Sequence, residues 1–493
     1  MFKRSFCGMV IFLMLGACAT PSPRAPDLET RAPSQFQGHA VLEALGKGNA
    51  SSAWSDVRWW TGFADPTLNA LVERAIANNF QIAAAAGRVQ EARALLRLSQ
   101  SRDDLLVELE LVASAQDSDR GRQGNSTAGI SNTGREEQSL LGGIGFAIPL
   151  DVAGRLDREA EAAAANLLAL QAQLRGQVIA TSTALTQEYL RLRGNQKQLH
   201  MLRDSVRLQE ETLKVVQARF EAGLSPELDV RRAETSVENL RAGIPVLEKA
   251  LQDGRFRLAT LTGRFAGDLE PELMTPAPLP KYALAIPTQL PLQVLQNRPD
   301  VQEAQARFAQ AAAELGVAEA NFYPSVELMA TLQVGSTASN GNPAVGILIG
   351  AVSAMINQVV WDGGARQAQL EAAKARAQIA LANYELTLRQ AVESVENALT
   401  ALSASANRQG SLERAVASSK RSFEQADALY QLGLVSFLDV VDAQRVFANA
   451  EQTLATEQTN YATQVAALFQ TLGVQSTDQQ AMTKGDPQVT LQN

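Results

Sequence analysis

The sequence is poor in aromatic residues and nearly lacks histidine and cysteine. Of its 493 residues, 5% are aromatic, two are His and two are Cys. Large globular cores usually depend on aromatic rings, so their scarcity disfavours a single large core. A zinc site, a Ser-His triad and a Cys-His pair all need residues that this chain hardly has. We therefore predict that the protein is not an enzyme and has neither a cofactor nor a metal site.

Positive charge is also scarce, since 44 Lys and Arg residues face 52 Asp and Glu residues and the formal net charge is −8. This balance argues against general nucleic-acid binding, which requires a basic surface. The sequence is instead rich in alanine, with runs at 83–86 and 162–165, among many Leu, Gln, Glu and Arg residues. These strong helix formers predict long helices rather than a compact α/β enzyme.

The N-terminal residues carry a targeting signal. Lys3 and Arg4 precede the apolar run 9–15, which small residues follow. This pattern is typical of a secretory signal peptide, here at 1–17, and the run is too short to span a membrane. The segment Leu15-Gly16-Ala17-Cys18 resembles the lipobox of bacterial lipoproteins, which implies a lipid on the cysteine and, with Ala rather than Asp next, an outer-membrane destination. The alternative is an ordinary signal peptide whose cysteine is incidental.

The segment that follows is predicted to be a lipidated tether. Residues 18–53 are rich in Pro, Ser and Gly and show no periodicity. Trp54, Trp59 and Trp60 come next, and we expect their rings to anchor the tether against the helices. Because Cys7 lies in the signal peptide, the mature chain has no second cysteine with which Cys18 could form a disulfide.

The rest of the chain consists of two copies of one unit. The segment 218–230 matches 428–440, and Gly223 pairs with Gly433 at an offset of 210 residues (433 minus 223). Ordered matches elsewhere, such as Asp151 with Asp362, disfavour chance similarity between alanine-rich helices. Repetition of this kind makes each copy one structural unit. We place the first repeat at 54–280, the second at 281–475 and a C-terminal tail at 476–493.

Each repeat is predicted to contain a helix, two strands, a long helix, a turn and a further helix. Apolar residues at helical spacing begin at Pro66, and a period of two follows in both repeats. Gly142-Gly143-Ile144-Gly145 falls inside a strand and opens no helix, so it is not a phosphate-binding loop. The predicted elements are helix 66–101, strands 107–113, 140–150, 326–334 and 345–358, long helices 154–223 and 364–433, and loops 118–134 and 335–341.

The lengths of these elements restrict the architecture. Strands of about ten residues with one apolar face suit a transmembrane β-barrel, although a strand of a soluble sandwich has the same pattern. An open sheet in lipid leaves its edge groups without partners, and the smallest barrels have eight strands. Several protomers must therefore contribute four strands each, and three protomers would give twelve. The two long stretches without proline would each reach about 100 Å as helices and need lateral partners.

Five motifs follow one another along the two repeats, at 59–68 (WWTGFADPTL), 223–230 (GLSPELDV), 297–301 (NRPDV), 321–324 (NFYP) and 361–364 (WDGG). Together with the repeat they resemble the TolC-like outer membrane efflux proteins, particularly the lipidated OprM/NodT branch. The resemblance implies a mainly α fold with a transmembrane β portion. A homotrimer would form a twelve-stranded β-barrel in the outer membrane and a long helical barrel in the periplasm. The implied partners are a periplasmic adaptor (membrane fusion) protein, an inner-membrane RND-type transporter and outer membrane lipid.

Two acids near the second turn are candidates for a gate. Asp439 and Asp442 are three residues apart and share one helix face. Threefold symmetry would turn each into a ring of three carboxylates, which constricts a pore and attracts cations. The resemblance places both at the family's constricting rings, and Asp229 is the first-repeat equivalent of Asp439. The alternative is that acids near helix N-termini only stabilise the helix dipole.

The resemblance also assigns roles to other residues near the two turns. It places Tyr430 where neighbouring helices are tied shut, a latch that some relatives complete with an arginine in the turn. This chain has Val435 there, so we expect the latch to be absent or built differently. Gly223-Leu224-Ser225 and Gly433-Leu434-Val435 are the expected docking points for the adaptor, although glycine also simply ends a helix.

Three acids in the predicted strands, Glu108, Glu110 and Glu327, are expected to face the barrel lumen, unless the register is shifted and they lie in loops. We therefore predict a passive export duct for drugs, toxic compounds or metal ions, driven by an inner-membrane pump. One alternative is the duct of a type I protein secretion system, which the lipobox disfavours. Another is a periplasmic coiled-coil adaptor without a pore, which the paired amphipathic strands disfavour.

Overall fold

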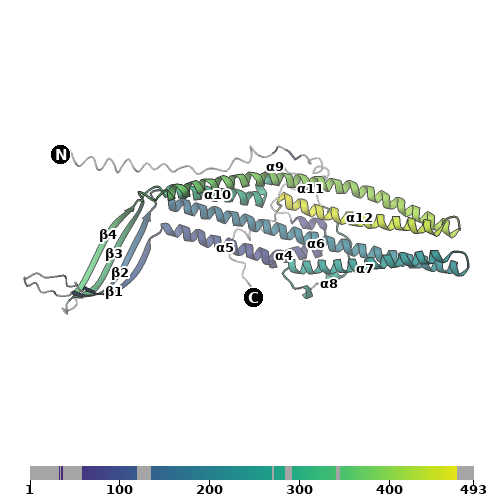
Figure 1. Cartoon of the computed structure of the whole chain (residues 1–493), viewed down its shortest axis with the longest axis horizontal. Coiled ribbons are helices and arrows are strands. Elements are labelled where there is room, and N and C mark those ends of the chain that lie inside the picture. The colour runs from purple at the N-terminus through teal and green to yellow at the C-terminus, as the bar shows by residue number, and fades with distance from the viewer. Residues whose placement is uncertain are drawn as a thin grey trace, which may run out of the picture. The chain divides into compact units, whose positions relative to one another are not determined.

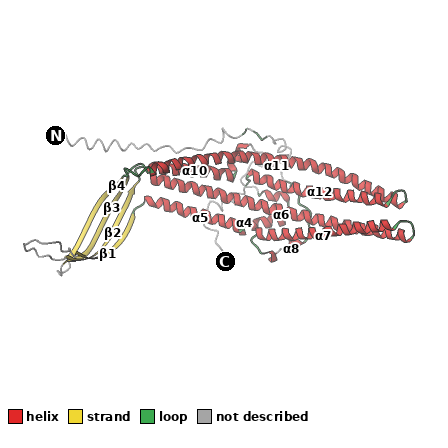
Figure 2. Cartoon of the chain, viewed as in Figure 1, coloured by secondary structure: helices red, strands yellow, loops and turns green. Residues whose placement is uncertain are grey.

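The computed structural model describes residues 58–118, 135–268, 271–283, 291–339 and 345–474, together with residues 33 and 35–36. The predicted signal peptide, Cys18, most of the tether, Trp54 and the C-terminal tail lie outside the described residues. Helices make up most of the described chain, and four strands form the rest of its regular structure (Figure 2). The fold is therefore mainly α with a β portion, as predicted. None of the described helices is both long and apolar enough to cross a membrane.

The elements appear twice in the same order, which confirms the tandem repeat. The first repeat contains α4 (Pro66–Asn78), α5 (Phe80–Gln100), β1 (Leu106–Ser118), β2 (Arg135–Leu150), α6 (Arg155–Glu221) and α7 (Glu227–Leu261). A short helix, α8 (Pro271–Met274), follows. The second contains α9 (Pro291–Asn297), α10 (Pro299–Ala320), β3 (Ser325–Ser339), β4 (Val345–Asn357), α11 (Ala365–Gln431) and α12 (Phe437–Leu472). Helices α6 and α11 have 67 residues each, which corresponds to about 100 Å.

The helix predicted at 66–101 is in fact two helices, because Asn79 interrupts it. The side-chain oxygen of Asn79 accepts hydrogen bonds from the backbone N–H groups of Gln81 (2.9 Å) and Ile82 (3.3 Å), as an N-cap residue does. Its side-chain amide donates to the carbonyl of Leu261 in α7 at 3.0 Å. The break thus depends on a tertiary contact, which helical periodicity does not reveal.

The strands are longer than predicted, and part of the loop expected at 335–341 is strand. β2 begins at Arg135 rather than at Leu140, and β3 continues to Ser339. Gly335 lies inside β3 opposite Leu141, and a Cβ atom there would collide with the carbonyl oxygen of Leu140. This glycine therefore permits close approach of two strands and does not mark a turn.

The four strands form one antiparallel sheet in the order β1-β2-β3-β4 (Figure 1). The register pairs Leu109 of β1 with Ile144 of β2, which in turn pairs with Leu332 of β3. Residues directly opposite one another share a face of the sheet. β1 and β4 are the edge strands, and each has a strand neighbour on one side only among the described residues.

Two compact units make up the described chain, and they do not coincide with the repeats. One unit takes its described residues from 90–168 and 306–382, which include the whole sheet. The other takes them mainly from 26–89, 169–305 and 383–474, which include both helix-turn-helix ends. Each unit therefore combines corresponding segments of both repeats.

The main core of the second unit is built around Trp59 and Trp60, whose exposed fractions are 1% and 2%. Trp59 stacks on Phe469 of α12, with ring centroids 5.2 Å apart and planes 12° from parallel. Phe36, from the segment predicted to be a tether, is buried in the same core. These contacts confirm that Trp59 and Trp60 anchor the chain preceding α4 against the helices.

Candidate functional site

The candidate gate lies at the two helix-turn-helix tips. The first tip joins α6 to α7 and the second joins α11 to α12 (Figure 1). Gly223 and Gly433 have φ angles of +70° and +76°, which side chains with a Cβ rarely adopt. Leu224 and Leu434 donate their backbone N–H groups to carbonyls at the ends of α6 and α11, at 2.8 and 2.9 Å. Both turns therefore end their helices in the same way.

A small hydrophobic core joins the two tips. It draws on all four helices, so the two hairpins pack on each other rather than standing apart. Its buried residues are Val216 of α6, Val230 and Ala233 of α7, Tyr430 of α11, and Phe437 and Val440 of α12. Truncating one of these buried side chains would leave a cavity between the hairpins, which costs stability.

Tyr430 is buried in this core, and the structure places a cation against it. The guanidinium carbon of Arg219 lies 4.7 Å from the centroid of the Tyr430 ring, and Arg219 Nη1 donates to the Tyr430 carbonyl at 3.4 Å. Burial raises the pKa of the phenol, an effect that Arg219 opposes and Asp229 reinforces. The Tyr430 hydroxyl has no hydrogen-bond partner among the described residues.

Sequence reasoning missed Arg219. The one signal that could have found it is the repeat itself, because the position equivalent to Arg219 in the second repeat holds Leu429. Because Leu429 carries no charge, the second repeat cannot make the equivalent cation contact.

The three candidate acids differ in their surroundings. Asp439 Oδ2 accepts hydrogen bonds from the Ser436 hydroxyl (2.7 Å) and the Ser436 backbone N–H (2.9 Å). These two bonds, the hydroxyl first, lower the pKa of Asp439. Asp442 pairs with Arg445 at 2.5 Å in an exposed ion pair, and Asp229 is mostly buried, 3.8 Å from Arg232. Asp439 thus stabilises the start of α12, as the dipole alternative supposed, and a gate role for it remains a prediction.

The tip residues proposed for docking divide into exposed and inward-facing ones. Leu224 of the first turn and Leu434 of the second are both 68% exposed, and the second turn exposes Leu432 as well, at 73%. Ser225 and Val435 are half-buried. Ser225 Oγ donates to the Val216 carbonyl at 3.5 Å, and Val435 packs against the tip core. The exposed leucines are therefore the better candidates for contact with another protein.

A groove opens beside the tips, between α6, α7 and α12. Its volume is about 920 Å³, and leucines, among them Leu208, Leu228 and Leu438, lie along it beside charged side chains. Two buried amide atoms in its lining, Gln209 Nε2 and Gln444 Oε1, have no partner among the described residues. No group of three or more His, Cys, Asp or Glu side chains in the described parts of the chain could hold a metal ion.

In the sheet, the predicted lumen acids lie in strands and share one face. Glu108 is opposite Gly145, and Glu110 is opposite Gly143. Glu327 is opposite Pro149, which lies on the same face of β2 as Gly143 and Gly145, so all three acids share one face. The alternative, that these acids lie in loops, is therefore wrong. Because the glycines have no side chains, the face is hollowed beside Glu108 and Glu110, with a volume of about 190 Å³.

The other face of the sheet is apolar throughout its middle. Every residue of this face is aliphatic, aromatic or glycine between 107 and 113, 140 and 150, 326 and 334, and 346 and 356. Many of these side chains are exposed, with Leu109 and Val352 each at 85%. Monomeric soluble proteins rarely expose an apolar surface of this extent.

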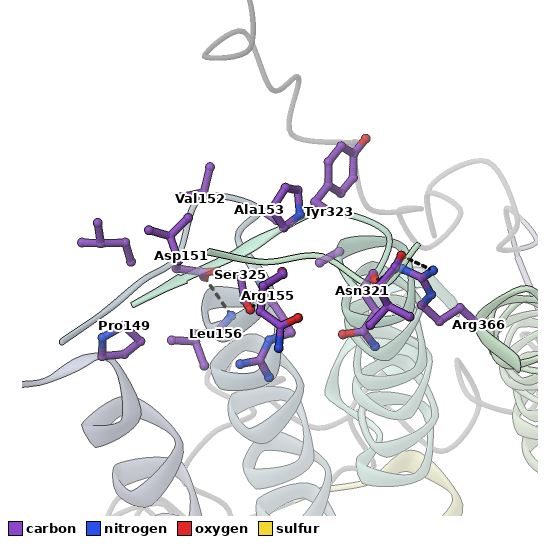
Figure 3. A pocket seen from close by; sticks show the side chains of 16 residues that line it. Pro149, Asp151, Val152, Ala153, Arg155, Leu156, Asn321, Tyr323, Ser325 and Arg366 are labelled. Carbon is purple, nitrogen blue, oxygen red and sulfur yellow. Dashed lines mark hydrogen bonds between the residues drawn. The ribbon is translucent and has the colours of Figure 1, made fainter. Parts of the chain in front are cut away.

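A cavity of about 290 Å³ lies where the end of β2 and the start of β3 meet the starts of the long helices α6 and α11 (Figure 3). Asp151 caps α6 by accepting from the backbone N–H of Arg155 at 2.7 Å. Arg366, near the start of α11, donates to the Asp362 carboxylate (2.7 Å) and to the carbonyls of Val359 (2.7 Å) and Asn321 (3.3 Å). The repeat-related acids Asp151 and Asp362 thus fix the direction in which each long helix leaves the sheet.

Comparison with known proteins gives one family. The model of the family described as outer membrane efflux protein matches residues 71–264 and 290–474. The cation efflux system protein CusC of Escherichia coli (strain K12) is 31% identical, covering 95% of this chain and 98% of CusC. Nodulation protein T of Rhizobium leguminosarum bv. trifolii is 27% identical, covering 94% and 95%. A solved structure of the outer-membrane channel OprN has a TM-score of 0.83 at 29% identity, covering 93% and 100%.

Proposed function

This chain belongs to the outer membrane efflux protein family, and we propose that three copies of it form one passive duct that exports small molecules. It is the outer membrane channel component of an efflux system. The sheet is the observation that supports the trimeric duct. It has an exposed apolar face, a face with acids and two edges that have no strand partner among the described residues. A passive duct performs no chemistry and supplies no energy of its own. The energy for export therefore comes from an inner-membrane partner.

The two faces of the sheet fit a barrel wall between lipid and water. The apolar face matches the outward band of a transmembrane β-barrel, and Glu108, Glu110 and Glu327 on the other face would line an aqueous lumen. Such a wall cannot have free edges in lipid, because each unpaired backbone group there costs several kcal/mol. We infer that β1 of one copy pairs with β4 of the next, and three copies close a barrel of twelve strands.

Cross-linking through cysteines tests this closure. One cysteine replaces Leu109 on β1 and a second is scanned over Leu348, Gly350 and Val352 on β4. Oxidation of the best pair should give bands of one, two and three chains and none larger. The control pairs Ile144→Cys with Leu332→Cys, which lie directly opposite within one chain and should give no band above the monomer. A ladder that continues beyond the trimer, or no linkage from any β4 position, would contradict the closed trimer.

A simpler measurement separates the duct from a coiled-coil adaptor without a pore. The trimer should require detergent for solubility, migrate differently on gels before and after heating, and conduct ions in planar lipid bilayers. A monomeric, water-soluble product would exclude the duct.

The tips are proposed to contact a periplasmic adaptor, which connects the duct to an RND-type inner-membrane transporter. The exposed Leu224 and Leu434 support this role. The variants Leu224→Asp and Leu434→Asp should abolish export in cells and leave the conductance of the purified channel unchanged. Loss of conductance in these variants would instead indicate a folding defect, and intact export would exclude docking at these leucines.

Asp439 and Asp442 are proposed to form acidic rings that narrow the pore and hold cations. The test uses Asp439→Asn and Asp442→Asn, because Asn removes the charge and keeps a side-chain oxygen for the cap of α12. Single-channel conductance should rise, and block by divalent cations should weaken. Unchanged conductance together with unchanged block would refute the assignment.

The substrate class and the lipid anchor are proposals as well. The names of the similar proteins include a cation efflux component, a pyoverdine exporter and an antibiotic efflux component, so we propose small molecules or ions as cargo without choosing among them. We also propose a lipid on Cys18, and mass spectrometry of the mature N-terminus tests it. The variant Cys18→Ser should lack the added mass.

A further inference from the structure

We propose that the groove beside the tips is a binding site for an uncharged molecule that carries a carboxamide group on an aliphatic body. The groove lies between α6 and α7 of the first hairpin and α12 of the second (Figure 1), so a bound molecule contacts both hairpins. Its volume of about 920 Å³ is in the range of pockets that bind small molecules. The site lies within one chain, so the inference goes beyond the proposed duct and does not depend on it.

Two glutamine side chains in the lining of the groove are buried without hydrogen-bond partners. Gln209 of α6 is 1% exposed and Gln444 of α12 is 7% exposed. Gln209 Nε2 and Gln444 Oε1 have no partner among the described residues. Buried polar atoms of folded proteins nearly always have a partner, because an unpaired one costs free energy. The two amides therefore mark where the polar atoms of a ligand would fit.

The two amides require a ligand that both accepts and donates a hydrogen bond. Gln209 Nε2 is a donor and Gln444 Oε1 is an acceptor, and a carboxamide supplies the complement of each. Gln209 precedes Gly223 by 14 residues (223 minus 209), and Gln444 follows Gly433 by 11 (444 minus 433). Because the tip core joins the two turns, the amides lie at levels that differ by about 5 Å along the helices. One ligand in the groove can therefore contact both.

The equivalent positions in the other repeat have their polar groups paired. Ser419, the equivalent of Gln209, donates its hydroxyl to a carbonyl of its own helix at 3.2 Å. Glu234, the equivalent of Gln444, accepts from Arg231 at 3.0 Å. The repeated backbone therefore does not itself require an unpaired polar group at these positions, and the two unpaired amides are a property of this groove.

The rest of the lining favours an uncharged ligand with an aliphatic body. Leu208, Leu228 and Leu438 supply apolar contacts along the groove. Each of the five cations in the lining pairs with an acid of its own helix, and a charged ligand would have to compete with these pairs. The five are Arg207, Arg231, Arg232, Lys420 and Arg445.

Protection of a cysteine in the groove tests the proposal on the full-length protein in lipid nanodiscs. Ser236→Cys places a thiol in the lining, and peptide mass spectrometry measures its rate of modification by methyl methanethiosulfonate. Hexanamide should slow this modification. The ketone 2-heptanone has nearly the same shape but no N–H donor, and it should need about tenfold higher concentration for equal protection, the factor expected for one hydrogen bond to a buried group.

A cysteine outside the groove is the control for this measurement. Ser418 is an exposed residue of α11 that does not line the groove. Hexanamide should leave the modification rate of Ser418→Cys unchanged, whereas a general effect on the reagent or the lipid would slow both thiols.

Two further variants test the amides themselves. Gln209→Met and Gln444→Met keep the length of the side chain and remove its polar atoms, so each should abolish the preference for hexanamide over 2-heptanone. Without ligand, neither should lower the thermal stability, because an unpaired buried group contributes none. Gln198→Met is the matched control. Gln198 lies on the same helix, outside the groove, and donates to Thr456 Oγ1 at 3.1 Å, so the preference should remain.

Other results would overturn the proposal. Equal protection by hexanamide and 2-heptanone in the Ser236→Cys protein would show that the groove makes no use of the amides, even if the glutamine variants fail to fold. A larger loss of stability in Gln209→Met or Gln444→Met than in Gln198→Met would show that the amides already have partners, such as water. A thiol at position 236 that does not react in the assembled protein would show that another copy covers the groove. None of these results bears on the duct, which conductance tests separately.

Discussion

The two tips have nearly the same sequence and the same turn geometry, yet they are stabilised differently. At the first tip, the N-cap of α7 is Pro226, which makes no side-chain hydrogen bond, and the exposed Glu227 follows it. At the second tip, the N-cap of α12 is Ser436, whose hydroxyl donates a hydrogen bond to Asp439, and Phe437, which follows it, is buried in the tip core. A repeated backbone can therefore keep its shape while the side chains that stabilise it change.

The largest difference between the tips should come from Phe437. Phe437→Ala empties part of the tip core and should destabilise the second tip by about 3 kcal/mol. The equivalent change in the first tip, Glu227→Ala, should stay within about 0.5 kcal/mol because the side chain is exposed. Hydrogen exchange of the backbone amides in the first turns of α12 and α7 measures both. Equal losses in the two tips would contradict the comparison.

The residue that separates the two short helices of each repeat also differs, and again the second repeat has more side-chain hydrogen bonds. Arg298, between α9 and α10, donates to the carbonyls of Ala391 (3.3 Å) and Thr471 (2.5 Å) and to Ser394 Oγ (2.8 Å). Its first-repeat equivalent, Asn79, has a single donated bond to Leu261 in α7. Arg298→Ala should cost about 2–3 kcal/mol and Asn79→Ala about 1 kcal/mol. The temperature at which the trimer dissociates should fall more for the first variant.

The turns themselves should behave alike. Gly223→Ala and Gly433→Ala each force a Cβ into a left-handed conformation and should each cost about 1 kcal/mol. No other group limits the space at either glycine, so the two losses should agree. Protease sensitivity at the two turns provides the measurement, and a clear inequality would show that the turns are not equivalent.

The smallest expected effect is electrostatic and occurs in the second tip only. The two Ser436 bonds lower the pKa of Asp439. Their stabilising contribution is therefore complete above the ordinary carboxyl pKa and is lost as the pH falls through the lowered value. Ser436→Ala removes the hydrogen bond that the Ser436 hydroxyl donates to Asp439. The pKa of Asp439 should then rise, and NMR titration of its carboxylate would show this shift. A pKa unchanged by this variant would indicate that the hydroxyl bond has no effect.

Patterns within each segment predicted most of the fold. The long stretches without proline gave α6 and α11, period two gave strands β1 and β3, and the repeat gave the order of elements. The prediction failed where distant residues decide local structure. Asn79 breaks a helix because it contacts Leu261, and Gly335 continues a strand because Leu140 lies against it. Arg219 escaped notice for the same reason, since its partner is 211 residues away.

By itself the sequence determined the repeat, the helix lengths, the alternation of the strands and the acids near the tips, because each depends on residues close in the chain. Only the tertiary structure decided which acids share a face of the sheet, which turn residues face inward, and which cation lies over Tyr430. Strand register and packing between hairpins are set by contacts between segments far apart in the chain, and residue spacing along the chain does not encode these contacts.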